Sequence, residues 1–209
     1  AAAEAAFLAA EIHEKTGRGD EAMAAFVEFE SRFARDRRAP ESKLRRAQIL
    51  SRRTQPAALM QARELYGEVA RDYAGTPHAQ IALQQKLRIE TAQKNLRVLD
   101  PVMKIQVPAV IPTLREIIEQ FPDSPQSMAA RTRLAGMLEN MDRHQEAAAM
   151  LEELGERAGA SGNPGEVFFR LGEIYERRLK DPVRAKDAYA KVPQGSPRYN
   201  EAQRRLKRR

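Results

Sequence analysis

Side chains that could do chemistry are few and widely separated in this sequence. The three histidines, His13, His78 and His144, lie far apart, and none has a second histidine or a carboxylate at the spacing of a metal site. The chain has no cysteine, which excludes thiolate nucleophiles, thiolate metal sites and disulfides. We interpret the histidines as surface or helix-end residues, and we predict no catalytic residue, no metal site and no cofactor.

Two further patterns could carry chemistry, and each has a simpler explanation. The carboxylates Glu152 and Glu153 could act as an acid–base pair, but they fall on the solvated face of an expected helix. The glycine-rich run at 159–165 lacks the Lys-Ser/Thr ending of a phosphate loop and follows a helix where such a loop would follow a strand. We interpret this run as a linker and predict that the chain is not an enzyme. A catalytic domain would have to lie in sequence upstream.

The elements that carry these side chains are amphipathic helices with a recurring pattern. Apolar residues recur at i, i+4, i+7 and i+11, which places them on one face of a helix. Five copies of this pattern follow one another at steps of 40, 48, 37 and 38 residues, and they begin at Ala22, Ala62, Val110, Ala147 and Ala185.

Each copy follows another expected helix, and turn residues separate the two. The first helices are expected at Glu4–Thr16, Glu41–Arg53, His78–Leu99, Gln126–Asn140 and Glu166–Lys180. Prolines and glycines punctuate the chain between them. A short amphipathic helix pair cannot bury its apolar faces alone, so the pattern predicts a stack of helix pairs. A capping helix is expected at 198–209, with Tyr199, Ala202 and Leu206 on its apolar face.

The fifth copy resembles a tetratricopeptide repeat. Leu171-Gly172, Tyr175, Ala185, Tyr189 and Pro197 occupy the consensus places of that family. The resemblance implies an all-α fold, a right-handed α-solenoid of about five helix-turn-helix repeats in a single domain. It also implies a non-enzymatic scaffold that binds another protein. The repeats are expected at 4–37, 41–75, 77–122, 125–160 and 165–197, and HEAT-like helix pairs remain an alternative.

Two turn motifs carry a narrower resemblance. Phe121-Pro122-Asp123-Ser124-Pro125 and Tyr73-Ala74-Gly75-Thr76-Pro77 are similar to turns in repeats of bacterial cell-envelope adaptors. This likeness implies a periplasmic or outer-membrane-associated location and only indirect contact with a membrane, and a cytoplasmic location stays open. Because the chain begins at Ala1 and not at a methionine, removal of a leader or an upstream repeat also stays open.

Charge is unevenly divided between first and second helices. The three middle first helices contain eleven basic and three acidic residues, whereas the matching second helices contain five basic and nine acidic residues. In tetratricopeptide arrays the first helices line the concave groove. We therefore predict a basic groove that binds an acidic or extended peptide segment of a partner. The basic residues assigned to this groove are Arg46, Lys86, Lys94, Arg131 and Arg133.

The same charges have a second interpretation. Several of them stand at helix C-termini, where cations complement the helix dipole, and others could pair with acids of adjacent helices.

An insertion interrupts the third repeat. The segment 100–112 contains three prolines among branched apolar residues, and this repeat has the longest step. Val102, Ile105 and Val107 could pack against their own repeat. Alternatively, they form an exposed apolar strip that binds a partner or a second copy.

The net charge of +7 suggests nucleic acid as an alternative ligand, through the basic groove and the tail 204–209. Five of the basic residues lie in that tail, so the body is close to neutral, and no aromatic residues are interleaved with Arg or Lys. Nucleic acid, or an anionic surface, is therefore the disfavoured alternative. The partner's identity and the oligomeric state cannot be read from the sequence.

Overall fold

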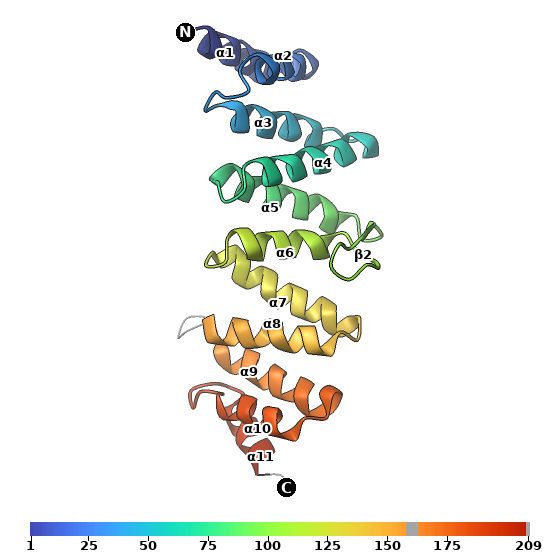
Figure 1. The fold of residues 1–209 in the computed structure, drawn as a ribbon, viewed down its shortest axis with the longest axis vertical. Coiled ribbons are helices and arrows are strands. Elements are labelled where there is room, and N and C mark those ends of the chain that lie inside the picture. Colours follow the sequence, from blue (N-terminus) through green and yellow to red (C-terminus); the bar gives the residue numbers. More distant parts are fainter. Residues whose placement is uncertain (158–162, 208–209) are drawn as a thin grey trace. The chain divides into compact units, whose positions relative to one another are not determined.

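The computed structural model describes residues 1–157 and 163–207, and these residues form antiparallel helices in sequence order (Figure 1). Helices in repeated succession and a short β-hairpin make up the fold. The helices are α1 (Ala2–Lys15), α2 (Gly19–Arg32), α3 (Ala39–Ser51), α4 (Pro56–Asp72), α5 (Pro77–Ala92), α6 (Val110–Gln120), α7 (Pro125–Asn140), α8 (His144–Arg157), α9 (Pro164–Glu173), α10 (Pro182–Ala190) and α11 (Tyr199–Leu206). A π-helical segment, η2 (Ile174–Leu179), continues α9.

Contacts group the chain into two compact units, an N-terminal unit (Ala1–Glu116) and a C-terminal unit (Ile117–Arg209). Each unit consists of helices packed against their neighbours in sequence, such as α3 on α4 and α7 on α8. The all-α helical-repeat fold expected from the sequence is confirmed. Residues 159–162 of the expected linker and the tail residues Arg208 and Arg209 lie outside the described residues.

Side-chain caps and prolines set where several helices begin. The hydroxyl of Thr76 accepts a hydrogen bond from the backbone of Ala79, and the hydroxyl of Ser124 accepts one from Ser127. The carboxylate of Asp181 does the same at the start of α10. In each case a proline follows the cap, where its missing N–H costs no hydrogen bond.

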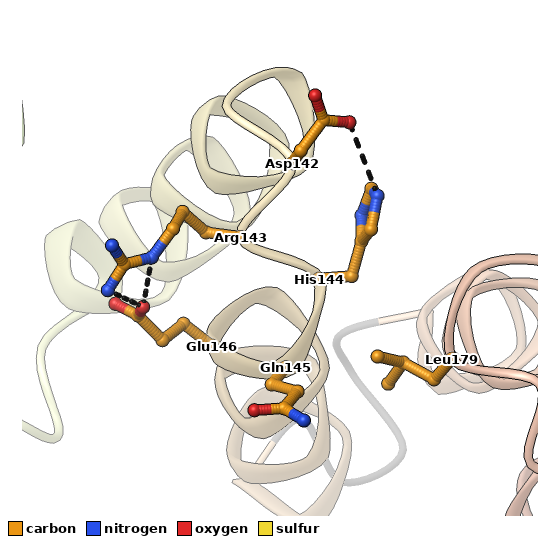
Figure 2. Close-up of a pocket in the computed structure, with 6 residues that line it drawn as sticks. All are labelled: Asp142, Arg143, His144, Gln145, Glu146 and Leu179. Atoms are coloured by element: carbon orange, nitrogen blue, oxygen red, sulfur yellow. Dashed lines mark hydrogen bonds and ion pairs between the residues drawn. The ribbon is translucent and has the colours of Figure 1, made fainter.

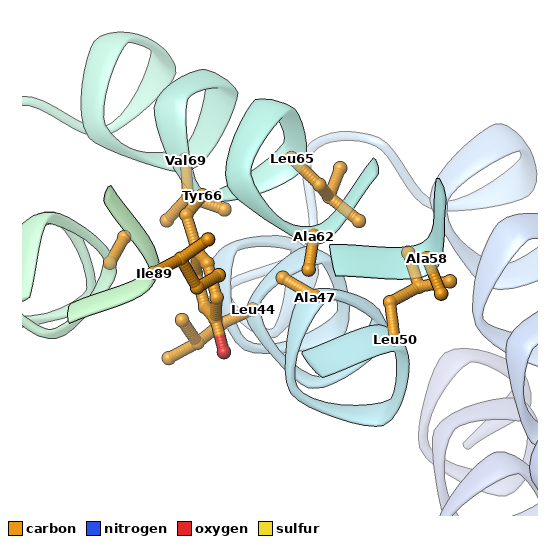
Figure 3. Close-up of a cluster of buried hydrophobic side chains, with 10 residues drawn as sticks. Leu44, Ala47, Leu50, Ala58, Ala62, Leu65, Tyr66, Val69 and Ile89 are labelled. Atoms are coloured by element: carbon orange, nitrogen blue, oxygen red, sulfur yellow. The ribbon is translucent and has the colours of Figure 1, made fainter. Parts of the chain in front are cut away.

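The core of the N-terminal unit lies between successive helices (Figure 3). Leu44, Ala47 and Leu50 of α3 meet Ala62 and Tyr66 of α4, and Tyr66 is fully buried. Ala47 has no exposed surface, so its small side chain lets α4 approach closely. Each helix pair therefore buries its stripe on its partner, as the i, i+4 spacing predicts.

The C-terminal unit repeats this arrangement with one added residue. Ala135 and Ala147 are 12 positions apart in α7 and α8, whereas Gly172 and Ala185 are 13 apart in the next pair. The π-helical turn η2 lies within this longer interval. A π turn is the usual way for a helix to absorb one extra residue. Leu171 before the insertion and Ala185 and Tyr189 after it are all buried.

The main departure from the sequence-based expectation lies after α5. A helix was predicted to run to Leu99, but α5 ends at Ala92 and a hairpin follows, with β1 (Arg97–Leu99) and β2 (Gln106–Pro108). The strands pair antiparallel, and Val98 stands opposite Val107. Figure 1 shows the hairpin beside the start of α6, where the green ribbon turns back.

Among the described residues, no helix is both long and apolar enough to span a membrane.

Gly172 provides a test of the close packing in the last helix pair. A Cβ at this position would lie 2.5–2.8 Å from the ring of Tyr189. We expect Gly172→Ala to lower the free energy of unfolding by about 1–3 kcal/mol, because the buried ring has little room to move. Urea denaturation followed by circular dichroism measures this change.

Gly136→Ala is the matched control, because it lies inside α7 and gains the same helix propensity. Its nearest neighbour is the end of the flexible Arg170 side chain at 3.3 Å. We expect this variant to be neutral or stabilised, and an equal loss in both variants would contradict the packing described for Gly172.

Candidate partner-binding surfaces

The basic residues expected to line a groove are largely held in ion pairs. The guanidinium of Arg46 on α3 lies 2.6 Å from the carboxylate of Glu30 on α2. The ammonium of Lys86 on α5 lies 3.0 Å from the carboxylate of Glu116 on α6, and the Lys86 side chain is only 9% exposed. Both cations therefore join one helix to another within the N-terminal unit.

Arg131 of α7 is the most deeply buried of these cations, with 1% exposure. Its guanidinium donates to the backbone oxygen of Pro122 at 3.0 Å and to the carboxylate of Glu153 on α8 at 2.9 Å. It also donates to the hydroxyl of Ser127. With three acceptors and almost no exposed surface, Arg131 is placed to stabilise the C-terminal unit.

Other first-helix cations follow the same rule. The ammonium of Lys43 lies 2.7 Å from the carboxylate of Asp72 on α4, and the guanidinium of Arg45 lies 2.9 Å from that of Glu11 on α1. Bases on first helices thus attract acids on neighbouring helices, on second helices for Arg46, Lys86 and Lys43 and on another first helix for Arg45. Pairing with adjacent helices, the second interpretation of the charge pattern, accounts for these residues.

Lys94 and Arg133, the other two residues assigned to the groove, differ from Arg46, Lys86 and Arg131. Arg133 on α7 is half-buried and makes an interaction within the chain. Lys94 was predicted on a first helix, but it lies in the turn between α5 and β1 and is exposed. Its placement is a correction, because the polypeptide leaves helical geometry at Gln93.

The insertion divides its apolar residues between the two interpretations offered above. Val107 on β2 is fully buried. Val102 is 68% exposed and Ile105 45% exposed, and Leu99 beside them is 63% exposed. We call Leu99, Val102 and Ile105 the hairpin patch.

Asp100 anchors the loop that carries this patch. One carboxylate oxygen accepts hydrogen bonds from the backbone N–H groups of Val102 (2.9 Å) and Met103 (2.6 Å). The other accepts from the guanidinium of Arg115 on α6 at 2.5 Å. Burial opposes ionisation of Asp100, but these donors outweigh it and hold the pKa of the carboxyl below its usual range. The patch is therefore presented on a loop fastened to the helix beneath it.

Three cations lie in the same segment as the hairpin patch: Lys94 in the turn before β1, Arg97 on β1 and Lys104 in the loop, which we call the cation rim. All three are exposed. In the part of the chain that the structure describes, no carboxylate forms an ion pair with any of them, and the only acid in the loop, Asp100, is already paired with Arg115. The insertion thus carries exposed apolar side chains and exposed cations.

Adjoining hollows in the C-terminal unit are lined by residues at the start of α8 and before it, and by residues of α8, η2 and α10. Figure 2 shows the first of these, where His144 and Asp142 point toward each other and Leu179 faces them from η2. In the others, Tyr175 donates a hydrogen bond to Glu152 at 2.7 Å. Burial and this carboxylate raise the pKa of Tyr175. The lining carries charges of both signs, so these hollows have no clear preference for one ligand charge.

Among residues 1–157 and 163–207, no group of three or more histidine, cysteine or acidic side chains is arranged to hold a metal ion.

The sequence analysis gave no role to Leu99, Lys104 or the pair of Asp100 and Arg115, and it counted Arg97 among the bases of a first helix. A signal for the hairpin was present, because Arg97-Val98-Leu99 and Gln106-Val107-Pro108 flank an Asp-Pro turn signal. The helical pattern of α5 continues into residues 93–99, so the sequence analysis assigned these residues to the helix and not to a strand.

Comparison with known proteins supports the tetratricopeptide character of the last helix pair. Residues 166–197 match the tetratricopeptide repeat family. This range covers α9, η2 and α10 and ends at Pro197. No curated protein matches the chain significantly in sequence.

Two solved structures are similar over most of the chain. One is YrrB, described as a TPR protein with an unusual peptide-binding site, at 13% identity and a TM-score of 0.43, covering 93% of this chain and 87% of that one. The other is MamA (41-end) from Desulfovibrio magneticus RS-1, at 14% identity and a TM-score of 0.42, covering 99% and 97%. These likenesses are distant, and no function follows from them.

A substitution at Lys86 tests whether this cation stabilises the fold or serves to bind a partner. Lys86→Glu would place a third carboxylate beside Glu116 and the buried Glu90. We expect it to lower the free energy of unfolding by about 3–5 kcal/mol, because it leaves buried charge without a partner. Thermal and urea unfolding measure the loss. Lys94→Glu, on an exposed turn, is the control and is expected to change stability by less than about 0.5 kcal/mol. A fully stable Lys86→Glu protein would contradict the structural role.

The lowered pKa of Asp100 predicts that the free energy of unfolding depends on pH. Because its pKa is lowered on folding, its ion pair stabilises the protein above the ordinary carboxyl pKa of about 3.9, and this contribution is lost as the pH falls through the folded pKa. We expect Asp100→Asn to cost about 1.5–3 kcal/mol at pH 7 and much less in acid. Urea titrations between pH 3 and 7 measure the difference. Asp187→Asn on α10 is the control, and a difference for Asp100→Asn that does not shrink in acid would refute the anchor.

Proposed function

We propose that this chain, whose last helix pair matches the tetratricopeptide repeat, is a non-enzymatic protein-interaction scaffold that captures an acidic, extended segment of a partner protein. Tetratricopeptide repeats generally serve as interaction scaffolds. The observation that carries the proposal is the hairpin patch, three large apolar side chains exposed on one anchored hairpin that also carries three exposed cations without carboxylate partners.

The apolar part of this surface supplies affinity. Leu99, Val102 and Ile105 are 63%, 68% and 45% exposed, although aliphatic side chains of this size gain about 1.5–3 kcal/mol each when fully buried. Several large exposed apolar side chains within one short segment are typical of interaction sites. Because the loop is already held by Asp100, little conformational entropy is lost when a partner covers it.

The charged part supplies the preference for acidic partners. Lys94, Arg97 and Lys104 are exposed, whereas Arg46, Lys86 and Arg131 are committed to carboxylates of adjacent helices. An acidic segment can therefore meet free cations at the hairpin without breaking an ion pair. The predicted groove of first-helix cations would require such breakage at Arg46, Lys86 and Arg131.

We place the scaffold in the bacterial cell envelope. The support for this location is the resemblance of the turns at 73–77 and 121–125 to turns of cell-envelope adaptors. Finding the protein in the cytoplasm of its source cell would overturn this part of the proposal and leave the binding surface unaffected.

Selection from a random peptide library tests the binding function. We expect the chain to enrich peptides that combine acidic and aliphatic residues. The variant Val102→Asp with Ile105→Asp should bind an enriched peptide at least about tenfold more weakly, because it places carboxylates in the apolar contact. Fluorescence anisotropy gives the affinities.

Val183→Asp is the matched control, because Val183 is 69% exposed on α10 of the C-terminal unit. It should bind as the wild type does. Equal binding by all three proteins would refute the hairpin as the site. Binding of a labelled single-stranded oligonucleotide that displaces the peptide would instead favour the nucleic-acid alternative.

A further inference from the structure

We infer that the partner segment binds as a third β-strand, hydrogen-bonded to the free edge of β1. This inference rests on the proposed function and specifies how the hairpin surface recognises its ligand. The ligand class is an extended peptide that presents an apolar residue to Leu99 and an acidic residue to Arg97.

The register of the hairpin leaves the β1 edge open. Hydrogen bonds join Ala109 N to Leu96 O and Asp100 N to Ile105 O, each at 2.9 Å, and Val98 pairs with Val107 between them. Antiparallel ladders alternate, so the N–H and C=O groups of the intervening residues point away from the partner strand. On β1 these residues are Arg97 and Leu99. Their backbone groups form a template for one more strand.

The opposite edge is closed to such pairing. Pro108 on β2 has no N–H to donate. The outward-facing backbone oxygen of Gln106 already accepts a hydrogen bond from the guanidinium of Arg97 at 2.6 Å. One edge of this two-stranded sheet is therefore available, and the other is capped by the chain itself.

The anchor makes the open edge rigid before any partner arrives. Asp100 follows Leu99 directly and is held by Arg115 and by two backbone N–H groups of its own loop. Val107, opposite Val98, is fully buried. A preformed strand edge avoids much of the ordering cost of strand addition.

Side-chain alternation sets the specificity. Arg97 and Leu99 lie on the same face of β1, and Val98 lies on the other. Residues that pair with Arg97 and Leu99 across an antiparallel ladder place their side chains on that same face. An acidic residue opposite Arg97 and an aliphatic residue opposite Leu99, two positions apart, would satisfy both. The acidic residue would meet the guanidinium N–H groups that do not donate to Gln106.

Charge and backbone geometry decide between possible occupants. In a second copy paired β1 to β1, the cation rims of the two copies would approach each other and repel. An anionic membrane would suit the cation rim and the hairpin patch, but lipid tails cannot satisfy the outward N–H and C=O groups of Arg97 and Leu99. A separate acidic peptide strand satisfies the charge, the apolar contact and the backbone together.

The test uses a capped, labelled eight-residue peptide, Thr-Val-Thr-Glu-Thr-Val-Thr-Glu, with the wild-type chain. One derivative is N-methylated at the valines and glutamates, and the matched control is N-methylated at the threonines. If the backbone N–H groups of the valines and glutamates point toward β1, the first derivative lacks the donors that would bond to β1. It should then bind at least about tenfold more weakly. The control should bind as the parent peptide does.

A pair of protein variants tests the same edge from the other side. Leu99→Pro removes an outward N–H from β1, and Gln106→Pro removes the corresponding outward N–H from β2. We expect only Leu99→Pro to weaken binding, and to do so more than Leu99→Ala. Circular dichroism and the urea midpoint verify that each variant is folded.

The outcomes separate this inference from the proposed function. Binding that is lost in the variant Val102→Asp with Ile105→Asp but is insensitive to N-methylation supports the scaffold and overturns the strand. Equal loss from both methylation patterns, or loss from the threonine pattern alone, also overturns it. Concentration-dependent dimerisation abolished by Leu99→Pro would assign the edge to a second copy. Binding to phosphatidylserine vesicles that displaces the peptide would assign it to a membrane.

Discussion

The pairing of first-helix cations with carboxylates of neighbouring helices is the interaction on which the rest of the structure depends. Lys86 meets Glu116 and Arg131 meets Glu153, and both cations are almost fully buried. Ion pairs at this depth are costly to break, because either partner alone would remain as an uncompensated buried charge. The pairs therefore set helix positions, and a partner that binds these first-helix cations would have to compete with their carboxylates.

Because most first-helix cations are held in ion pairs, the insertion after α5 is the stronger candidate for a binding surface. The repeat pattern is interrupted there, and the hairpin carries exposed apolar side chains and cations without carboxylate partners. Asp100 connects the helical body to the hairpin loop. Its carboxylate pairs with Arg115 of α6, and in doing so it holds the loop that presents Val102. A helical-repeat body thus supports a rigid surface that the helices themselves do not form.

Several parts of the fold could be predicted from sequence because local rules decide them. The i, i+4, i+7 spacing located the second helices, and Pro, Thr and Ser signals located several starts, such as Thr76 at α5. Gly172 was placed correctly in a tetratricopeptide consensus, and the structure gives its reason in the ring of Tyr189. The repeat boundaries at 4–37, 41–75, 77–122, 125–160 and 165–197 stay a prediction, as does the list of binding residues.

Other features were beyond local rules. The sequence shows how many charges a helix carries but not which carboxylate pairs with each cation. From sequence alone, Arg46 and Lys86 could therefore equally be groove residues or partners of acids on adjacent helices. The split between buried Val107 and exposed Val102 depends on hairpin register, which short strands specify weakly from sequence. The end of α5 was misplaced for the same reason, because helical periodicity continued into residues that pair as a strand.

Hydrogen–deuterium exchange with and without a saturating acidic peptide tests the central claim most directly. If the peptide adds a strand to β1, the amides of Arg97 and Leu99 should exchange more slowly in the complex, and those of α3 and α7 should not change. Protection spread along α3, α5 and α7, with no change at Arg97 and Leu99, would contradict the account and return the site to the first helices.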